Sequence, residues 1–485
     1  MRLSKILKGL EYKLIQGNEA IEIEKIEYDS RKVGKGDIFV CITGFQTDGH
    51  TYALKAVQNG ALALVCEKEL PELSSSITVI KVKNTREALA FLSANYYDAP
   101  SEAMNVIGVT GTNGKTTTTY FISSILEKAG HKTGIIGTIE NKIGERVLHT
   151  ERTTPESLEL QKLFYEMQHE QVNDVIMEVS SHSLDLHRVD AISYNIGIFT
   201  NLTQDHLDYH KTMENYKLAK AKLFERCKAS VINIDDEAGK FMMEKSKGKV
   251  ITFGIDNKAD LQAENIHISS DGVSFTLDYE QKQFPVILHT PGKFSIYNAL
   301  GSIGACLLME IPMTVIIEGL KENQGVSGRF QTIKNKKGFH AIVDYAHTPD
   351  GLENILNTAN EFVKGKILTV FGCGGDRDRT KRPIMGEIAG RLSNYCIITS
   401  DNPRTENPET ILDDVEEGMK KTKCEYIKLV DRKEAICHAI EIAKEGDVVV
   451  IAGKGHEDYQ IFKDKTIHFD DVEEVKKAFG EDLLI

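Results

Sequence analysis

The sequence lacks the features that mark a membrane-inserted or secreted protein. No run of 18 apolar residues occurs in the chain, and the stretch MRLSKILKGLEYKL at its start has no uninterrupted apolar core of signal-peptide length. The 8 cysteines form no Cys-x-x-Cys pair and mostly lie in apolar segments, so we expect buried thiols rather than disulfides or a zinc site. These absences predict a cytoplasmic protein that is not inserted in a membrane.

Positive charge is also scarce. Lysine and arginine number 59 against 72 aspartate and glutamate residues, which gives a formal net charge of −13. Such a balance disfavours non-specific binding to nucleic acid or to anionic lipid, although it allows a local basic pocket. We therefore expect no nucleic-acid partner.

The chain is too long for a single hydrophobic core, and its 485 residues suggest about three domains. The polar, proline-bearing segment YYDAPSEAMN and the glycine-bearing segment GVSGRF have the composition of domain boundaries. The sequence therefore predicts an N-terminal domain over 1–100, a central domain over 101–328 and a C-terminal domain over 329–485.

The order of apolar runs predicts an α/β protein throughout. Short strand-like runs and one helical stretch predict a mixed α/β N-terminal domain, and strand–helix alternation from Asn105 predicts a mainly parallel central sheet. The turn Ser270-Asp271-Gly272 lies between two β-rich runs and predicts an antiparallel hairpin at the edge of that sheet. Strand and helix alternate again beyond Arg329, which predicts a doubly wound, Rossmann-like C-terminal domain.

The stretch VTGTNGKTT lies between a predicted strand and a predicted helix, where a phosphate-binding loop is expected. Gly111 and Gly114 let backbone N–H groups turn toward phosphate oxygens, Lys115 supplies charge, and the Thr116 hydroxyl can reach Mg²⁺. Val109 stands where the usual pattern has a first glycine, and an ordinary glycine-rich turn is the alternative. No Asn-Lys-x-Asp sequence is present, which favours ATP over a guanine nucleotide.

Two further clusters follow predicted strands of the central domain. Glu178 ends an apolar run, where a carboxylate is costly unless it has a cationic partner. By itself it suggests a structural ion pair, but a neighbouring phosphate loop favours a Mg²⁺ ligand. The second cluster is the segment DHLDYH, which contains Asp205, His206, Asp208 and His210. So many side chains of the kinds that bind metals, so close together, suggest a functional site.

Lys220 occupies an unusual position in the predicted helix YKLAKAKLFERC. At 100° per residue it projects onto the apolar stripe with Tyr216 and Phe224, so its side chain is expected to point inward. One interpretation is a stem that packs while its ammonium reaches solvent. The other is an amine that reacts with CO₂, because the resulting carbamate is an oxygen ligand for a metal.

Charged and glycine-rich loops follow several predicted strands of the C-terminal domain. They contain Arg377 and Arg379 in GGDRDRTKRP, Arg404 in SDNPR, and Gly453, Lys454 and Glu457 in GKGHE. Any one of these charges is most simply a solvated loop residue. Together they predict a pocket for an anionic, carboxylate-bearing ligand, in which Glu457 can accept an ammonium.

With these residues in view, the sequence resembles the ATP-dependent Mur ligases over nearly its whole length. The motifs that carry the resemblance are DSR, TGTNGKTT, TTP, EVSSH, TNLTQDHLDYH, YNALG, SGRFQ, DYAHTPDGL, GGDRDRTKRP, SDNPR and GKGHE. The resemblance implies a ligase that activates the D-glutamate carboxylate of UDP-N-acetylmuramoyl-L-alanyl-D-glutamate as an acyl phosphate, which an incoming amine then displaces. It places the reaction in peptidoglycan precursor synthesis, and thus in cell-wall growth, cell shape and division.

The resemblance also implies a role for individual residues. The catalytic residues it implies are Lys115, Glu178, His206 and Lys220, the last as a carbamate formed with CO₂. The Mg²⁺ ligands it implies are Thr116, Glu178, His206 and Lys220. The nucleotide contacts are Thr110, Gly111, Thr112, Asn113, Gly114, Lys115, Thr116, Asn298, Arg329 and Asp344, with His347 at the domain junction. The contacts to the UDP-linked dipeptide are Ser30, Thr153, Thr154, Ser180 and Arg188. The diaminopimelate contacts are Arg377, Asp401, Asn402, Pro403, Arg404, Gly453 and Glu457.

Arg404 is the residue expected to determine which amino acid the ligase adds. In the resembling family, Asp-Asn-Pro-Arg marks members that add meso-diaminopimelate rather than lysine. Pro403 stiffens the turn that presents Arg404. A guanidinium can bind the second carboxylate of diaminopimelate with two parallel hydrogen bonds and repels the terminal ammonium of lysine. The alternative is an arginine that only braces its loop against Glu406 or Glu409.

Two other functions remain compatible with the sequence. Folylpolyglutamate synthetases share the central domain plan and also join an amine to an activated carboxylate, although SDNPR and GGDRD favour the muropeptide ligases. The chain could instead be an ATP-driven switch protein, and phosphate release that requires both a carboxylate substrate and an amino acid would discriminate these functions. We expect small-molecule substrates as the partners and favour a monomer.

Overall fold

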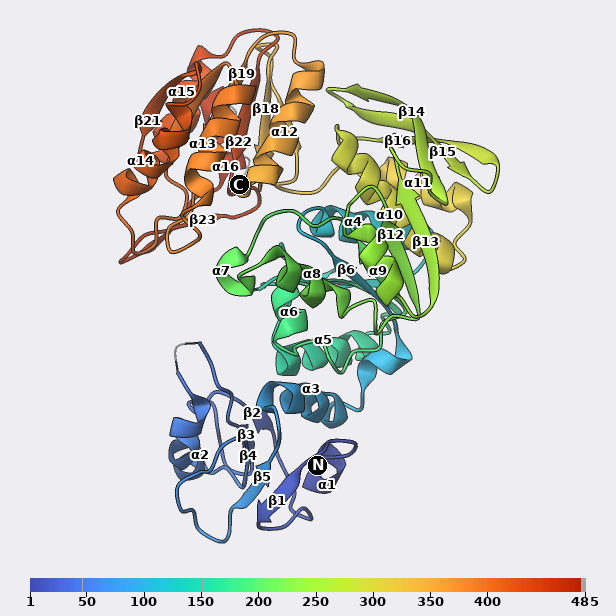
Figure 1. The fold of residues 1–485 in the computed structure, drawn as a ribbon, viewed down its shortest axis with the longest axis vertical. Coiled ribbons are helices and arrows are strands. Elements are labelled where there is room, and N and C mark those ends of the chain that lie inside the picture. The colour runs from blue at the N-terminus through green and yellow to red at the C-terminus, as the bar shows by residue number, and fades with distance from the viewer. Residues whose placement is uncertain (46, 151, 481–485) are drawn as a thin grey trace. The chain divides into compact units, whose positions relative to one another are not determined.

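The computed structural model describes residues 1–45, 47–150 and 152–480, so the end of the expected C-terminal domain, 481–485, lies outside the described residues. The chain divides into two compact units. Unit 1 consists of residues 1–108, 131–197 and 225–228, and unit 2 of residues 109–130, 198–224 and 229–485. Figure 1 shows the elements of both units in chain order by colour.

The first part of unit 1 is a five-stranded sheet with the order β1-β5-β4-β3-β2. Strands β2 to β5 run parallel, and β1 pairs antiparallel with β5. Alternate side chains point to opposite faces, so Val40 packs in one core and Phe39 in the other. The strands are β1 (Lys13–Gln16), β2 (Ile26–Glu27), β3 (Ile38–Val40), β4 (Ala63–Cys66) and β5 (Thr78–Lys81).

Helices cover both faces of this sheet. Leu89 and Leu92 of α3 pack in the core that contains Val40, and Ala53 and Ala56 of α2 pack in the opposite core. The Asn84 side chain accepts from the backbone N–H of Arg86 and of Glu87, which satisfies the first turn of α3. The helical segments are α1 (Leu3–Ile6), η1 (Gly49–Tyr52), α2 (Ala53–Asn59), α3 (Thr85–Tyr96) and η2 (Pro100–Ala103).

The second part of unit 1 contains the strand series β6-β10-β7-β8-β9. Strands β10 and β7 are parallel, whereas β8 and β9 form an antiparallel hairpin that the sequence did not predict. The strands are β6 (Asn105–Thr110), β7 (Thr133–Ile136), β8 (Asn141–Ile143), β9 (Arg146–Leu148) and β10 (Asp174–Glu178), and the helices are α5 (Ser157–His169) and α6 (Ser181–Asp185). The last residues of β6, Val109 and Thr110, carry the chain into unit 2.

Unit 2 begins with the turn from β6 into α4 and continues with the strand series β11-β12-β13-β14-β15-β16. Strands β12 to β14 are parallel. The strands are β11 (Ile196–Phe199), β12 (Ala229–Asn233), β13 (Lys249–Gly254), β14 (Leu261–Ser269), β15 (Gly272–Tyr279) and β16 (Lys282–Leu288). The helices are α4 (Lys115–Lys128), α7 (Leu207–His210), α8 (Met213–Ala221), α9 (Gly239–Lys245), α10 (Lys293–Leu308) and α11 (Met313–Glu322).

The predicted antiparallel hairpin is confirmed, with Ser269 opposite Gly272 across the turn. The structure adds a third strand, because β15 pairs antiparallel with β16 as well. Glu280 and Gln281 connect these strands with φ values of 50° and 64°, which are the left-handed values of a tight hairpin turn. Neither residue is a typical turn former, so the sequence gave no signal for this turn.

The C-terminal part of unit 2 is a six-stranded sheet with the order β17-β18-β22-β19-β20-β21. All neighbours from β18 to β21 are parallel, which confirms the predicted doubly wound domain, and β17 is an antiparallel edge strand. The strands are β17 (Gln331–Lys334), β18 (His340–Asp344), β19 (Ile367–Phe371), β20 (Tyr395–Thr399), β21 (Glu425–Leu429) and β22 (Val448–Ala452). A separate hairpin joins β23 (Tyr459–Ile461) to β24 (Thr466–His468).

Helices cover both faces of this sheet as well (Figure 1). Apolar residues of α12, α13 and α14 pack in one core and those of α15 and α16 in the other. These helices are α12 (Pro349–Phe362), α13 (Lys381–Leu392), α14 (Pro408–Met419), α15 (Arg432–Ile442) and α16 (Asp471–Phe479). The loops after β18, β19, β20 and β22 therefore leave the carboxyl ends of neighbouring parallel strands, the edge at which α/β sheets bind ligands.

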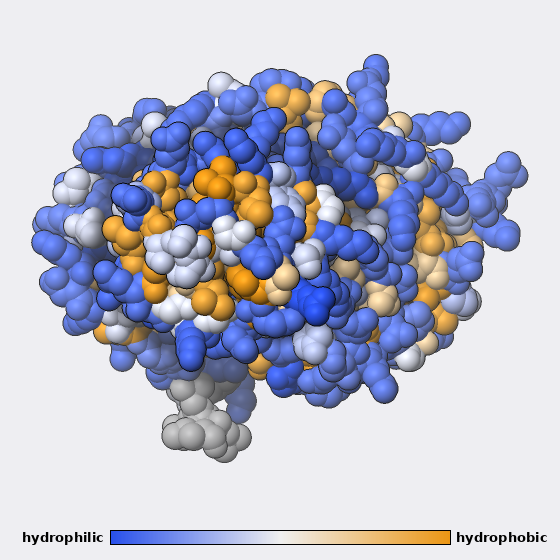
Figure 2. All heavy atoms as spheres, turned by 90° about the horizontal axis from the view of Figure 1, so that it is seen from below, coloured by the Kyte–Doolittle hydropathy of each residue, from blue (hydrophilic) through white to orange (hydrophobic). Residues whose placement is uncertain are grey.

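Figure 2 shows one face of the molecule, which is mostly hydrophilic and has apolar side chains gathered near its centre. Within the described ranges, no helix is both long and apolar enough to cross a membrane. The cysteines are all free thiols and most are buried, as the sequence predicted.

Candidate active site

The phosphate loop of unit 2 follows β6 and ends at the first turn of α4, as the sequence predicted. Gly114 has a φ of 85°, and a Cβ added there would lie 2.3 Å from Oδ1 of Asn298. Only glycine fits that position without displacing Asn298, which links α10 to the loop. The first backbone N–H groups of α4 have no intrahelical acceptor, so this turn is suited to binding phosphate.

The Lys115 ammonium lies over the loop. Its Nζ donates to the carbonyl oxygens of Gly111 at 3.0 Å and Thr112 at 2.8 Å. The Thr112 hydroxyl lies 3.2 Å from the hydroxyl of Tyr216, and the backbone N–H of Asn113 donates to Oδ1 of Asn201 at 2.9 Å. Tyr216 and Asn201 thus fix the loop from α8 and from the segment after β11, and the sequence had not indicated this role for either.

Lys220 points inward, as its place on the apolar stripe predicted. The residue is 1% exposed, and its Nζ donates to the carbonyl oxygen of Gly111 at 2.7 Å. The same ammonium lies 4.5 Å from the ring centroid of Tyr216. Burial, together with the nearby charge of Lys115, lowers the pKa of Lys220 well below that of an ordinary lysine, although Asp205 and Asp236 oppose the shift. The structure therefore favours the neutral amine.

An acid with several basic neighbours, Asp205, lies near Lys220 in unit 2. Burial raises the pKa of Asp205, but the basic groups of His206, His347 and Lys381 outweigh this effect and leave the pKa below its usual value. Nε2 of His206 lies 3.3 Å from Oδ2 of Asp205. His206 has a φ of 54°, an uncommon conformation for a residue other than glycine, at the start of α7.

Arg329 brings the C-terminal part of unit 2 to the start of α4. Its Nη2 donates to the Thr116 hydroxyl at 3.1 Å, and its guanidinium lies 4.5 Å from the ring centroid of Tyr345. The Asp344 carboxylate holds the surrounding segment, because it accepts from the backbone N–H groups of Phe330 at 2.6 Å and Ala346 at 2.7 Å. Thr116, Arg329 and Asp344, all predicted nucleotide contacts, are thus linked in one unit.

His347 follows on the same segment. Burial and the charge of Lys381 lower the pKa of His347 to about 4, against the opposing influence of Asp205. Nζ of Lys381 donates to the carbonyl oxygen of His347 at 2.8 Å. His347 is therefore neutral at physiological pH, and Lys381 supplies the positive charge in this region.

Glu178 is the last residue of β10 in unit 1. It is 1% exposed, and its two carboxylate oxygens accept from the backbone N–H and the hydroxyl of Thr138, both at 2.9 Å. The Thr138 hydroxyl also lies 3.0 Å from the hydroxyl of Thr153. No cationic side chain is among these partners, so the contacts differ from the ion pair that was the structural alternative for Glu178.

Several predicted dipeptide contacts of unit 1 lie together. The Thr154 hydroxyl donates to the carbonyl oxygen of Glu178 at 2.8 Å and lies 3.3 Å from the Ser180 hydroxyl. Arg188 donates to the carbonyl oxygen of Thr154 at 3.1 Å and pairs with Glu156 at 2.9 Å. The predicted contact Ser30 lies in the turn after β2 of unit 1, where its carbonyl oxygen accepts from Nδ2 of Asn59.

The loops after β20 and β22 form a polar cluster in the C-terminal part of unit 2. Nδ2 of Asn402 donates to Oε2 of Glu457 at 2.8 Å, and the fully buried Lys454 lies 3.2 Å from the same oxygen. Burial raises the pKa of Glu457 despite Lys454. A Cβ on Gly453, whose φ is 121°, would lie 2.8 Å from Oδ2 of Asp401, so this position also requires glycine.

Arg404 lies on the turn that Pro403 begins. Its Nη1 donates to the carbonyl oxygen of Gly375 at 2.8 Å, which joins the loop after β20 to the loop after β19. Glu406, the partner that the bracing alternative named first, pairs instead with Arg382. Arg377, the other predicted carboxylate contact, donates to the carbonyl oxygen of Asp376 at 3.1 Å.

Models of known protein families match most of the chain. The "Mur ligase family, catalytic domain" matches residues 22–97, the "Mur ligase middle domain" residues 109–306, and the "Mur ligase, glutamate ligase domain" residues 328–455. A UDP-N-acetylmuramoyl-L-alanyl-D-glutamate–2,6-diaminopimelate ligase of Clostridium botulinum is 56% identical over 485 residues, covering 99% of this chain and 100% of the relative. The chain belongs to the Mur ligase family.

Further relatives of this Mur ligase cover the same length. The ligase of the same name from Clostridium tetani is 52% identical over 99% of the chain and 100% of the relative. A solved structure, also of a UDP-N-acetylmuramoyl-L-alanyl-D-glutamate–2,6-diaminopimelate ligase, has a TM-score of 0.71 at 33% identity and covers 99% of both chains. The MurF ligase of Thermotoga maritima, solved in complex with ADP, shares the fold with a TM-score of 0.63 at 18% identity, over 94% of this chain and 97% of that one.

Sequence reasoning identified the ends of this Mur ligase's strands but missed the residues that fix them. Asn201 and Tyr216 contact the phosphate loop. Elsewhere in unit 2, Tyr345 contacts Arg329, and Lys381 contacts His347. Within the described part of the chain, no group of three or more His, Cys, Asp or Glu side chains is arranged to hold a metal ion.

Proposed function

We propose that this Mur ligase is an ATP-dependent enzyme that joins meso-diaminopimelate to the D-glutamate carboxylate of UDP-N-acetylmuramoyl-L-alanyl-D-glutamate. The carboxylate attacks the γ-phosphate of ATP, and ADP leaves. An amino group of diaminopimelate then attacks the resulting acyl phosphate and loses a proton, and inorganic phosphate leaves. The names of the relatives contain the UDP-linked dipeptide and diaminopimelate, which supports these small-molecule substrates. We place the reaction in the cytoplasm.

The observation that carries this proposal is that unit 2 contains residues for two different sites. This unit contains a phosphate loop with Lys115 and the start of α4, and it also contains Arg404 and Glu457, which have the opposite charges that an amino-acid head group requires. A nucleotide site alone would fit a switch protein. A unit that contains both a nucleotide site and a site for an amino acid fits a ligase.

The phosphate loop supplies the groups for phosphoryl transfer. Lys115 can exchange the carbonyl oxygens of Gly111 and Thr112 for phosphate oxygens, since both of these groups belong to the loop itself. Arg329 can bring a second positive charge to the same phosphates from its place beside Thr116. Cations at these positions stabilise negative charge that develops on the transferred phosphoryl group.

The residues expected to hold Mg²⁺ have suitable donor atoms. Thr116 is buried with its hydroxyl at the start of α4, and Glu178 is a buried carboxylate whose described partners are neutral donors, so both provide the oxygen ligands that Mg²⁺ prefers. We assign the imidazole of His206 to a second cation. Bound Mg²⁺ would neutralise phosphate charge. Thr116 and His206 belong to unit 2 and Glu178 to unit 1.

Lys220 fits a carbamate in its chemistry. Its burial and the neighbouring Lys115 favour the neutral amine, which is the form that attacks CO₂. The reaction forms an N–C bond and releases one proton, and it converts a buried base into an anion beside Lys115. We assign that anion to the second Mg²⁺ together with His206.

The C-terminal loops account for the choice of amino acid. Arg377 and Arg404 supply guanidinium groups for the carboxylate on the distal head of diaminopimelate. Glu457, which also accepts from Nδ2 of Asn402, receives the distal ammonium together with Gly453. We assign Asp401, Asn402 and Pro403 to the same pocket. Thr153, Thr154, Ser180 and Arg188, with Ser30, are assigned to the UDP-linked dipeptide.

The test is the substrate dependence of phosphate release. With purified protein and Mg²⁺, phosphate should appear only when ATP, the UDP-linked dipeptide and meso-diaminopimelate are all present, and mass spectrometry should show the tripeptide product. Phosphate release that needs neither the dipeptide nor the amino acid would favour a switch protein. Release with a pteroyl substrate and glutamate would favour a folylpolyglutamate synthetase.

A further inference from the structure

Arg382 is a buried charge that the proposed reaction leaves without a role. It lies in the first turn of α13 with no exposed surface. Its guanidinium makes two hydrogen bonds with the Glu406 carboxylate, at 2.8 and 3.0 Å, and a third with Asp414 at 2.9 Å. It also donates to the carbonyl oxygen of Gly374 at 3.2 Å. A guanidinium that binds two acids and a carbonyl group fixes the relative positions of all three.

These contacts lie where the loops after β19 and β20 meet. Gly374 belongs to the first loop and Glu406 to the second, so Arg382 bridges the two. Glu406 also accepts from the backbone N–H of Asp376, and the Asp376 carboxylate in turn accepts from the backbone N–H and the hydroxyl of Thr405. Each loop therefore supplies both donors and acceptors to the other.

The backbones of the two loops are also in direct contact. The N–H of Gly375 donates to the carbonyl oxygen of Asn402 at 2.9 Å. A Cβ on Gly375 would lie 1.9 Å from the carbonyl oxygen of Pro403, so a larger residue would force the loops apart. We call the paired segments 374–378 and 402–406 the double loop.

The double loop carries both arginines that are assigned to the substrate carboxylate. Arg377 lies in the first segment and Arg404 in the second, with Arg404 at a φ of 52°. The N–H of Arg404 donates to the carbonyl oxygen of Ile461 in β23 at 3.0 Å, so the hairpin braces the turn independently of Arg382. The spacing between Arg377 and Arg404 nevertheless depends on how the two segments are joined.

We propose that Arg382 is a positioning residue for the amino-acid substrate, because it joins the double loop and thereby sets the spacing of Arg377 and Arg404. This inference rests on the proposed function, since it assigns the two arginines to a carboxylate of the amino acid. Arg382 itself binds no substrate group. It determines how well two separate guanidinium groups match one carboxylate, and a mismatch of about 1 Å can cost up to ~100-fold in rate.

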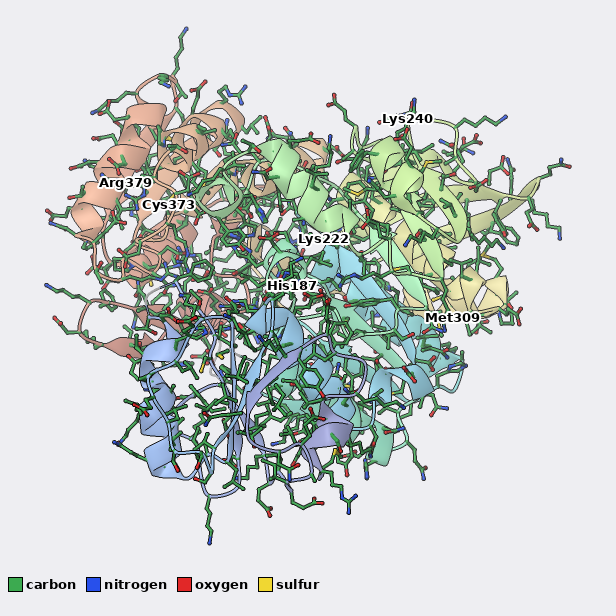
Figure 3. All side chains as sticks on the ribbon, turned by 60° about the horizontal axis from the view of Figure 1, so that its bottom comes forward. His187, Lys222, Lys240, Met309, Cys373 and Arg379 are labelled. Carbon is green, nitrogen blue, oxygen red and sulfur yellow. The ribbon has the colours of Figure 1, made fainter. Side chains whose placement is uncertain are left out.

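The charge state of Glu406 supports a permanent link. The pKa of Glu406 is lowered to about 2, mainly by its hydrogen bonds with Arg382, so this carboxylate is ionised throughout the range in which a ligase is assayed. Asp414 also accepts from the exposed Arg379, labelled in Figure 3, at 3.0 Å. The link is therefore a set of charged contacts rather than one exposed pair.

The experiment compares Michaelis constants for the three substrates. Arg382→Lys keeps the charge but loses the planar fork, and Glu406→Gln keeps the shape but loses the charge. Both should raise the KM for meso-diaminopimelate about tenfold or more while the KM values for ATP and for the UDP-linked dipeptide change by about twofold at most. Arg391→Met is the matched control, because Arg391 lies on the same helix in an exposed pair with Glu353, and it should leave all three constants unchanged.

The outcomes separate this inference from the proposed function. A wild-type protein without diaminopimelate-dependent phosphate release would overturn the proposed function. An active wild type with an unchanged diaminopimelate KM in both variants would overturn only the role of Arg382, as would equal increases in all three constants. If Arg382→Lys does not fold, Glu406→Gln and Thr405→Val decide the question, since both change the same junction at partly solvent-accessible positions.

Discussion

Replacing Arg404 with alanine should reduce the use of meso-diaminopimelate far more than the use of ATP. The Arg404 guanidinium is half-buried and donates through Nη1 to the carbonyl oxygen of Gly375, so its approach to a ligand is already fixed before substrate binds. A preorganised group loses little conformational freedom on binding, and the full strength of its contact contributes to affinity.

The magnitude follows from the contact that is lost. A charge-assisted hydrogen bond in a partly buried site contributes about 1.5–3 kcal/mol, so the loss should lower kcat/KM for meso-diaminopimelate roughly 10- to 150-fold. The variant also loses the hydrogen bond from Arg404 to the carbonyl oxygen of Gly375. This loss adds to the effect, because Arg377 lies on the same loop as Gly375. The KM for ATP should stay within about twofold, since Arg404 contacts no group of the phosphate loop.

The assay measures kcat/KM for meso-diaminopimelate and for L-lysine with wild type, Arg404→Ala and Arg404→Lys. Wild type should prefer meso-diaminopimelate, and Arg404→Ala should lose most of that preference. Arg404→Lys should recover only part of it, because an ammonium cannot form the two parallel hydrogen bonds of a guanidinium. A wild type that prefers lysine, or an Arg404→Ala variant with unchanged selectivity, would refute the reasoning.

Three other predictions concern the nucleotide site and its surroundings. Lys115→Ala should remove nearly all phosphate release while its circular dichroism and melting temperature stay close to those of wild type, because Lys115 is half-buried and donates to carbonyl groups of the loop; normal turnover in a folded variant would contradict the site. Lys220→Ala should be nearly inactive and should regain activity with added acetate or formate, and a bare amine at Lys220 in the active complex, seen by mass spectrometry without decarboxylation, would contradict the carbamate. The unfolding free energy should fall as pH drops from 6.5 to about 4, because the pKa of His347 is lowered from 6.5 to about 4 in the folded protein, so that only the unfolded chain gains a proton in that range. Urea titrations of wild type and His347→Gln at both ends of the range should show a smaller loss in the variant, and equal losses would contradict the shift.

Local sequence patterns predicted the features that depend on neighbouring residues. The glycine loop before α4, the inward Lys220 and the strands β18 to β22 all follow from spacing and polarity within short windows. The hairpin at Ser270-Asp271-Gly272 was found because its turn residues are typical. The next turn, at Glu280-Gln281, was missed because its residues adopt positive φ without being glycine or asparagine.

Features that depend on distant residues were not predictable in this way. The contact between Arg329 and Thr116 joins residues 213 positions apart, and the pair of Asn113 and Asp350 joins residues 237 positions apart. The burial of Arg382 was missed for a related reason, since its partners Glu406 and Asp414 lie in other segments and a charged residue beside Pro383 is ordinarily exposed. The hairpin of β23 and β24 is short and mostly polar, so it has little apolar alternation to reveal it.

The most direct test of the central claim follows one oxygen atom. The UDP-linked dipeptide is prepared with ¹⁸O in the D-glutamate carboxylate and incubated with ATP, meso-diaminopimelate, Mg²⁺ and the protein. Attack of that carboxylate on the γ-phosphate transfers one labelled oxygen to the phosphate that is released, so the account predicts ¹⁸O in inorganic phosphate in a one-to-one ratio with tripeptide formed. Phosphate that carries no label would mean that water attacks ATP, and it would contradict an acyl-phosphate ligase.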